Sequence, residues 1–140
     1  MTKREALARF LSVEPEEVAE AGWDHYGLEV FKVGDEEYAV GTDEEADEAV
    51  REAILSSLWA FRTEFIISHC DLPWELEEMI RTYQETKCEG ANEAIRALIE
   101  ACGDLDKFVE EAVEEDGRGH FLATYDGVEE EEGEYYIYRL

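Results

Sequence analysis

The sequence predicts a single α+β domain spanning residues 1–140, in which a helical bundle packs on a small antiparallel sheet. Apolar residues recur at helical spacing through the middle of the chain, whereas patterns typical of strands occur towards both ends. A length of 140 residues suits one domain, and no linker rich in Pro, Gly or Ser divides it. The sheet is therefore expected to combine an N-terminal hairpin with C-terminal strands, with the helices covering one of its faces.

Two short helical segments are expected at the N-terminus. Residues 2–11 place Leu7 and Phe10 on one side, as in an amphipathic helix. Pro15 favours the start of a second helical segment, which should end near Gly22.

Strand patterns occur in two regions. Alternation over residues 26–40, interrupted by the turn residues 34–35, predicts a β-hairpin. Residues 120–122 and 134–139 predict C-terminal strands, separated by an acidic loop that begins at the Asp126-Gly127 turn signal.

The central helix is expected over about residues 43–68. Thr42 and Glu45 form a capping-box pattern, in which each side chain accepts a hydrogen bond from the other residue's backbone N–H. Beyond Ala53 the segment is apolar on most sides, which is typical of a buried helix. We expect the remaining helices to pack around it.

Further helices should follow the central one. Pro73 favours the start of the next helix, and residues 89–90 predict a break or bend. Gly103 should end another helix, Asp104 should cap the one after it, and Gly117 should end that one.

Charge is the strongest functional signal. The chain has 12 Lys and Arg but 38 Asp and Glu, giving a net charge of −26, and its pI is near 4.2. Direct binding to DNA, RNA or an anionic membrane needs a cationic surface, so these functions are disfavoured. An apolar fraction of 45% is enough for a packed globule despite this charge.

The expected location is the cytoplasm. No apolar run approaches the roughly 20 residues that span a bilayer, and the first residues lack the apolar core of a signal peptide. Three cysteines in unrelated contexts suit reduced thiols better than a disulfide framework.

The acidic residues form two clusters. Residues 104–134 hold 13 acids against Lys107 and Arg118, a local charge of −11, and residues 43–52 hold the second cluster. Carboxylates at i, i+4 on a helix have Cβ atoms about 5–6 Å apart, and duplex DNA carries one phosphate per ~1.7 Å of axis. Carboxylates fixed on a folded surface are thus predicted to imitate phosphates in the basic groove of a nucleic-acid-binding protein.

Two tyrosines are further candidate contacts. On a strand, Tyr136 and Tyr138 face opposite to Tyr135 and Ile137, so one of these pairs should lie outside the core. Packing at a core or sheet edge is the alternative for them. The candidate partner-binding residues are Asp43, Glu44, Asp47, Glu48, Glu110, Glu111, Glu114, Glu115, Asp126, Glu129, Glu130, Glu131, Glu132, Tyr136 and Tyr138.

Enzymatic and metal sites are not expected. His120 beside Asp116 or Asp126 would suit a hydrolase with Arg118 as an anion contact, but turn glycines and pairing of Arg118 with acids explain this segment better, and no nucleophile motif is present. The cysteines lack a C-x-x-C pair, and no calcium-loop pattern is present. We therefore expect no cofactor and no metal.

Four stretches, residues 37–49, 58–61, 116–127 and 136–139, resemble small, acidic, uncharacterised proteins of tailed bacteriophages and prophages. The resemblance implies a phage origin, a place in the host cytoplasm, and inhibition of a host defence such as restriction or CRISPR. It implies no catalytic residues.

Two other functions stay open. One is an acidic accessory or assembly module that binds a protein partner through the tyrosine-rich C-terminal strand. The other is acidity that serves solubility or salt adaptation, although 29 Glu against 9 Asp disfavours salt adaptation.

Overall fold

The computed structural model describes residues 1–140 and confirms the α+β class. The chain, which the sequence predicts to be one domain, falls into two compact units. Unit 1 comprises residues 1–52 and 116–140, and unit 2 comprises residues 53–115. Each unit is described by itself.

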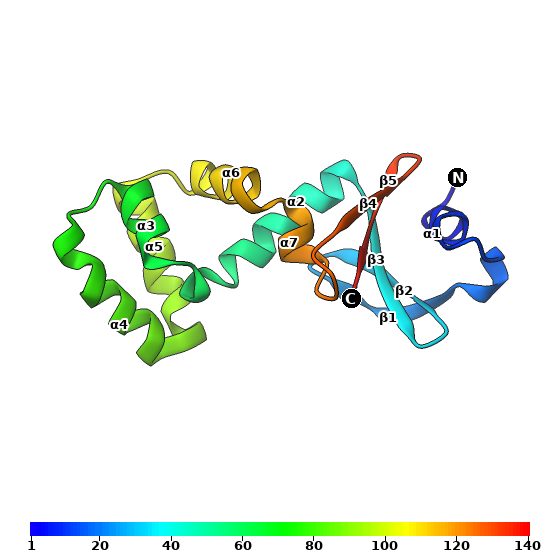
Figure 1. Cartoon of the computed structure of the whole chain (residues 1–140), viewed down its shortest axis with the longest axis horizontal. Helices are drawn as coiled ribbons and strands as arrows, with labels where there is room; N and C mark the ends of the chain where they lie inside the picture. Colours follow the sequence, from blue (N-terminus) through cyan, green and yellow to red (C-terminus); the bar gives the residue numbers. More distant parts are fainter. The chain divides into compact units, whose positions relative to one another are not determined.

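Unit 1 contains the whole sheet (Figure 1). Helix α2 begins in this unit and helix α6 ends in it. Its elements are helix α1 (Lys3–Leu11), the 3-10 turn η1 (Pro15–Glu17), strands β1 (Ala19–His25), β2 (Leu28–Val33) and β3 (Glu36–Thr42), the start of α2 (Asp43–Leu55), α7 (Arg118–Leu122), and strands β4 (Glu129–Glu132) and β5 (Tyr135–Arg139).

The sheet is antiparallel with strand order β1-β2-β3-β5-β4. The predicted hairpin is confirmed as β2 and β3, and the two ends of the chain pair through β3 and β5, with Val40 opposite Ile137. Strand β5 is therefore an interior strand, and β4 lies at one edge.

Three local predictions are wrong. Residues 19–22, expected to belong to the helical segment that ends near Gly22, lie in strand β1, where Gly22 has a φ of +83° at an irregular register with β2. Residues 129–132, expected to be a loop, form β4 because they pair with β5. Residues 120–122, expected to be a strand, belong to helix α7.

Helices cover both faces of the sheet, contrary to the expectation of one covered face (Figure 1). On one face, Leu7 of α1 packs with Val40 and Ile137. On the other, α7 lies against the sheet, with Arg118 Cζ 4.7 Å from the centroid of the Tyr136 ring. Both faces of β5 are consequently shielded by helices.

Unit 2 is helical. Its core includes an aromatic cluster in which the ring centroids of Phe61, Phe65 and Phe108 lie 5.0–5.8 Å apart. The elements are the 3-10 turns η2 (Leu58–Ala60), η3 (Trp74–Leu76) and η4 (Cys88–Ala91), and helices α3 (Thr63–Cys70), α4 (Glu77–Lys87), α5 (Asn92–Cys102) and α6 (Leu105–Asp116).

The predicted helix over residues 43–68 is broken. Helix α2 ends at Leu55 and α3 begins at Thr63. At the break, the Ser57 hydroxyl donates to the carbonyl of Ala53 at 2.8 Å, so the side chain competes with the backbone for a helix-end acceptor.

A buried amide stabilises the segment between α2 and α3. The Gln84 side-chain NH₂ donates to the carbonyls of Leu58 (3.2 Å), Trp59 (3.3 Å) and Phe61 (2.9 Å). Its Oε1 accepts a hydrogen bond from the Thr63 hydroxyl at 2.6 Å. The Leu58 carbonyl also accepts from the Phe61 N–H within η2 at 3.2 Å. Gln84 thus supplies hydrogen bonds from another helix to carbonyls at the break between α2 and α3.

The other helix boundaries largely follow the sequence. Asp104 caps α6 by accepting from the Lys107 N–H at 3.2 Å, as predicted. Gly103 follows α5, Gly117 follows α6, and η4 forms the predicted bend. None of the helices combines the length and apolar character needed to cross a bilayer.

Candidate functional site

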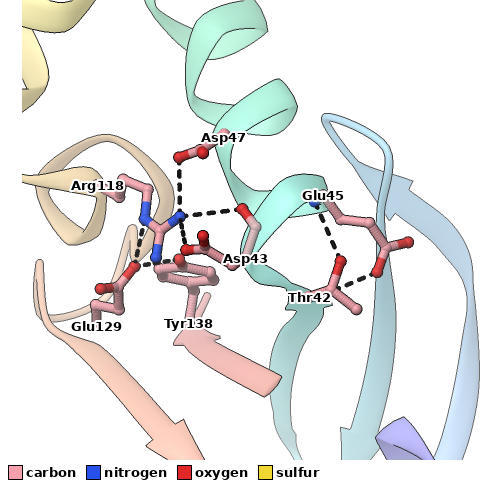
Figure 2. Close-up of polar contacts among 7 residues, drawn as sticks. All are labelled: Thr42, Asp43, Glu45, Asp47, Arg118, Glu129 and Tyr138. Atoms are coloured by element: carbon pink, nitrogen blue, oxygen red, sulfur yellow. Dashed lines mark hydrogen bonds and ion pairs between the residues drawn. The ribbon is translucent and has the colours of Figure 1, made fainter. Parts of the chain in front are cut away.

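Arg118 lies at the centre of a group of carboxylates in unit 1 (Figure 2). Its Nε donates to Glu129 at 2.8 Å, and its Nη1 donates to Asp43 at 2.8 Å and to Asp47 at 2.9 Å. The Arg118 side chain is only 11% exposed, whereas Asp43 and Asp47 remain exposed. One guanidinium thus holds three carboxylates, and a local charge of −2 remains.

The sequence explains how α2 presents its acids. The predicted capping box is present: the Glu45 N–H donates to the Thr42 hydroxyl at 3.2 Å, and the Thr42 N–H donates to Glu45 at 2.9 Å (Figure 2). With the helix start fixed, Asp43 and Asp47 lie one turn apart on the same face. Acids in this first turn also favour the positive end of the helix dipole.

Lys3 adds a second contact at the start of α2. Its Nζ donates to Glu45 at 3.1 Å. Partial burial favours the neutral form of Glu45, but the hydrogen bonds from Thr42 and Lys3 outweigh burial and hold the pKa of Glu45 below its ordinary value.

Two glycines place Arg118. Gly117 has a φ of +82°, a conformation that glycine adopts without steric cost. A Cβ atom on Gly119 would lie 2.7 Å from both the Glu129 nitrogen and the Gly127 oxygen. The backbone of α7 therefore approaches the start of β4 closely, which brings Arg118 within reach of Glu129.

Tyr138 is part of this network and not a partner contact. Its side chain is 0% exposed, and its hydroxyl donates to Glu129. Burial, and then the hydrogen bond to Glu129, raise the pKa of Tyr138. Tyr138 therefore packs in the core, which is the alternative that the sequence left open, and it is not an exposed contact. Tyr136 is half-buried beneath Arg118.

Burial also affects Arg118 itself. Burial alone opposes the charged form, but the contacts with Glu129 and Asp43 outweigh it and raise the pKa of the guanidinium. Arg118 therefore stays charged and is occupied by acids of its own chain. It is not available as the anion contact of a hydrolase.

Strand β4 presents four consecutive glutamates at the sheet edge. Glu129 and Glu131 lie opposite Tyr138 and Tyr136, so they share the face that α7 covers. Glu130 and Glu132 point to the other face. A strand rises about 3.2–3.4 Å per residue, so glutamates two positions apart on one face are spaced about 6.5 Å along the strand. This is roughly twice the ~3.4 Å axial rise between successive phosphates on one strand of DNA.

The remaining acids of unit 1 that the sequence selected are exposed. Glu44 and Glu48 lie on α2 beside the two aspartates that Arg118 holds. Asp126 accepts a hydrogen bond from the Val128 N–H at 3.0 Å in the turn before β4. We refer to Asp43, Glu44, Asp47, Glu48, Asp126 and Glu129–Glu132 as the unit 1 carboxylates.

The other four selected acids belong to unit 2. Glu110, Glu111, Glu114 and Glu115 lie on α6, so the sequence cluster 104–134 is divided between the two units. Glu115 lies 3.4 Å from the Arg62 guanidinium.

His69 makes an internal contact with this part of α6. Its Nδ1 lies 2.8 Å from Glu111, and its Nε2 lies 2.9 Å from the Asp104 carbonyl oxygen. Its ring lines an open hollow of about 800 Å³ together with residues including Phe65 and Glu114. Because both ring nitrogens have partners, His69 is not positioned as a free general base.

The residues considered for a hydrolase are not brought together. His120 is exposed and packs edge to face on Phe121 at 4.9 Å, without a hydrogen bond to Asp116 or Asp126. No group of three or more His, Cys, Asp or Glu side chains is placed to hold a metal ion.

Comparison with protein-family models, with curated proteins and with solved structures finds no match to this chain. The resemblance to phage proteins therefore stays a prediction.

The sequence offers two interpretations of Arg118, an anion contact or a partner of neighbouring acids, and the structure supports the second. Two of its partners, Asp43 and Asp47, are more than 70 residues away in the sequence. A solitary basic residue inside an acidic tract is the sequence signal for such a role.

Proposed function

We propose that this chain is a non-enzymatic acidic inhibitor that occupies the basic nucleic-acid-binding surface of a host protein, in the manner of a phage anti-defence protein. The observation that carries the proposal is the arrangement of the unit 1 carboxylates. All of them except Asp126 lie on a helix and an edge strand that Arg118 links through Asp43, Asp47 and Glu129.

Fixed carboxylates suit this role better than a mobile acidic tail. A basic groove gains affinity when bound counterions are released by an anionic ligand, and a ligand held in its bound shape loses less conformational entropy on binding. The glutamates of β4 are held by pairing with β5, so their spacing is set before any partner arrives.

Both units are negative, and unit 1 carries the larger share. It holds 23 acids and 7 bases, whereas unit 2 holds 15 acids and 5 bases, giving −16 and −10. The long-range field of such a protein steers it towards cationic surfaces. The arrangement of carboxylates on β4 and α2 then favours those cationic surfaces that bind a row of phosphates.

A partner contact through the C-terminal strand has less support. β5 has a strand on each side, so its backbone offers no free edge. Tyr138 is buried, and Tyr136 lies beneath Arg118.

Protection of the sheet edge is a competing explanation for the β4 glutamates. Charged residues on an edge strand discourage pairing between copies of a protein. This explanation predicts no nucleic-acid-binding partner, so experiment can separate it from mimicry.

The direct test is capture of host proteins from a bacterial lysate on the immobilised protein, with duplex DNA as competitor. We expect nucleic-acid-binding proteins to be retained and DNA to displace them. Retention of other classes of protein only, or failure of DNA to compete, would contradict the proposal.

A variant sharpens this test. Glu130→Gln, Glu131→Gln and Glu132→Gln together remove three charges from β4 and leave Glu129 to hold Arg118 and Tyr138. The matched control replaces Glu16, Glu89 and Glu93, all exposed elsewhere, by Gln. Only the β4 variant should lose the retained proteins.

A further inference from the structure

Unit 2 exposes its large apolar side chains in one short segment. Trp74 is 58% exposed, Met79 is 62% exposed and Tyr83 is 37% exposed. Met79 and Tyr83 lie one turn apart on α4 and share a face, and Trp74 lies in the turn that leads into this helix. We name these three residues the α4 apolar patch.

The core of unit 2 does not need these side chains. Helix α4 packs inward through Ile80 and Gln84, which are buried and satisfied. Trp, Tyr and Met are enriched where proteins bind one another, and Met adapts its shape to different partners. A group of exposed large apolar side chains on one segment marks an interaction surface.

The charges around the patch indicate the kind of partner. Glu75, Glu78 and Glu85 are exposed on the same segment. Arg81 is the only basic residue of α4 between Met79 and Tyr83, and its guanidinium is bound by Glu64 at 2.9 Å and also by Glu77. The rim of the patch is therefore negative apart from Lys87 at the end of α4, and it complements an apolar face bordered by positive charge.

A second copy of this chain is a poor occupant. It would place the same glutamates opposite one another, and like charges across an interface oppose association. An amphipathic helix rich in Lys or Arg satisfies both features, because its apolar stripe packs on a neighbouring helix while its basic residues meet the acidic rim.

We propose that the α4 apolar patch binds a cationic amphipathic helix of a partner protein. This site uses unit 2 only and none of the unit 1 carboxylates, so it stands or falls independently of nucleic-acid mimicry.

The test uses a synthetic amphipathic peptide with a leucine stripe and a lysine-rich polar face. A peptide of the same composition with its leucines scattered controls for charge attraction alone. Binding to the full chain is measured by calorimetry at near-physiological salt. We expect the amphipathic peptide to bind at least about tenfold more tightly than the scattered one, which is about 1.4 kcal/mol.

Variants locate the binding. Met79→Ser and Tyr83→Ser change exposed side chains, and circular dichroism verifies that the fold is retained. Each should weaken binding of the amphipathic peptide at least severalfold. Val128→Ser removes an apolar side chain that is 45% exposed in unit 1, and it should leave binding unchanged.

Three results would overturn the proposal. The first is equal binding of the two peptides, which would mean charge attraction only. The second is an equal effect of Val128→Ser and Met79→Ser. The third is self-association of the protein that Met79→Ser abolishes, which would assign the patch to a second copy.

Discussion

The Nε of Arg118 donates a hydrogen bond to Oε1 of Glu129 at 2.8 Å and so joins helix α7 to the edge strand β4. The same guanidinium holds two aspartates of α2. A single basic side chain therefore fixes the relative positions of the elements that carry the unit 1 carboxylates.

Replacing Arg118 by Ala should lower the free energy of unfolding by about 1–3 kcal/mol, because several charge-assisted hydrogen bonds are lost at a largely buried position. Arg96→Ala removes an exposed i, i+4 pair with Glu100 and should cost less than about 0.5 kcal/mol. Urea unfolding compares the two. Equal midpoints would contradict the role given to Arg118.

The close approach of α7 and β4 gives a second prediction. Gly119→Ala should destabilise unit 1 by about 1–3 kcal/mol, because the new methyl group meets backbone atoms 2.7 Å away. Gly90→Ala is the control, since its nearest neighbour would be 3.9 Å away. Thermal unfolding should show a lower midpoint for Gly119→Ala only, and an unchanged midpoint would mean that α7 does not lie against β4.

The buried Tyr138 predicts a loss of stability at high pH. Its pKa is raised in the folded protein above the ordinary value of 10.0, so the unfolded chain ionises first. The contribution is complete below pH 10 and is lost as pH rises towards the folded pKa. Burial, and then Glu36, raise the pKa of Tyr38 to about 12, with the same sign.

Chemical unfolding at several pH values checks this prediction. Above about pH 10, the free energy of unfolding should fall more steeply for the wild type than for Tyr138→Phe. Tyr138→Phe starts lower because it lacks the hydrogen bond to Glu129. Parallel curves would show that Tyr138 is not shielded as described.

Gln84 tests the break between α2 and α3. Gln84→Leu should destabilise unit 2 by about 2–3 kcal/mol, because the carbonyl of Phe61 and the hydroxyl of Thr63 lose a buried partner. Thr82→Ala, at an exposed position of the same helix, should change stability by less than about 0.5 kcal/mol. Urea unfolding measures both, and a neutral Gln84→Leu would contradict the account of the break.

Local signals allowed much of the fold to be predicted. The capping box at Thr42, the hairpin turn after Val33 and the cap at Asp104 depend on residues within a few positions of one another. Helix spacing then located α4, α5 and α6.

Other features of the fold depend on contacts between residues far apart in the sequence, which local patterns do not reveal. Gln84 holds a helix break more than 20 residues away. The tract Glu129–Glu132 has little strand propensity, and its pairing with β5 overrides that tendency.

The candidate site likewise combines features that composition predicts with features that depend on tertiary structure. Composition identified the acids, but the division of residues 104–134 between two units depends on tertiary structure. Alternation predicts an exposed pair of tyrosines only when one face of the sheet meets solvent. Because α1 and α7 cover opposite faces, Tyr138 is buried instead.

The central claim is that the glutamates of β4 stand in for phosphates on a partner's basic surface. Its most direct measurement is equilibrium competition with duplex DNA for a captured partner over a range of salt concentrations, comparing the wild type, the triple glutamine variant of β4 and the matched control. The account predicts that the β4 variant competes at least about tenfold more weakly. Its binding should also depend less steeply on salt concentration, by the equivalent of about two to three fewer ionic contacts. Equal competition by the β4 variant and the control would show that net charge alone is responsible.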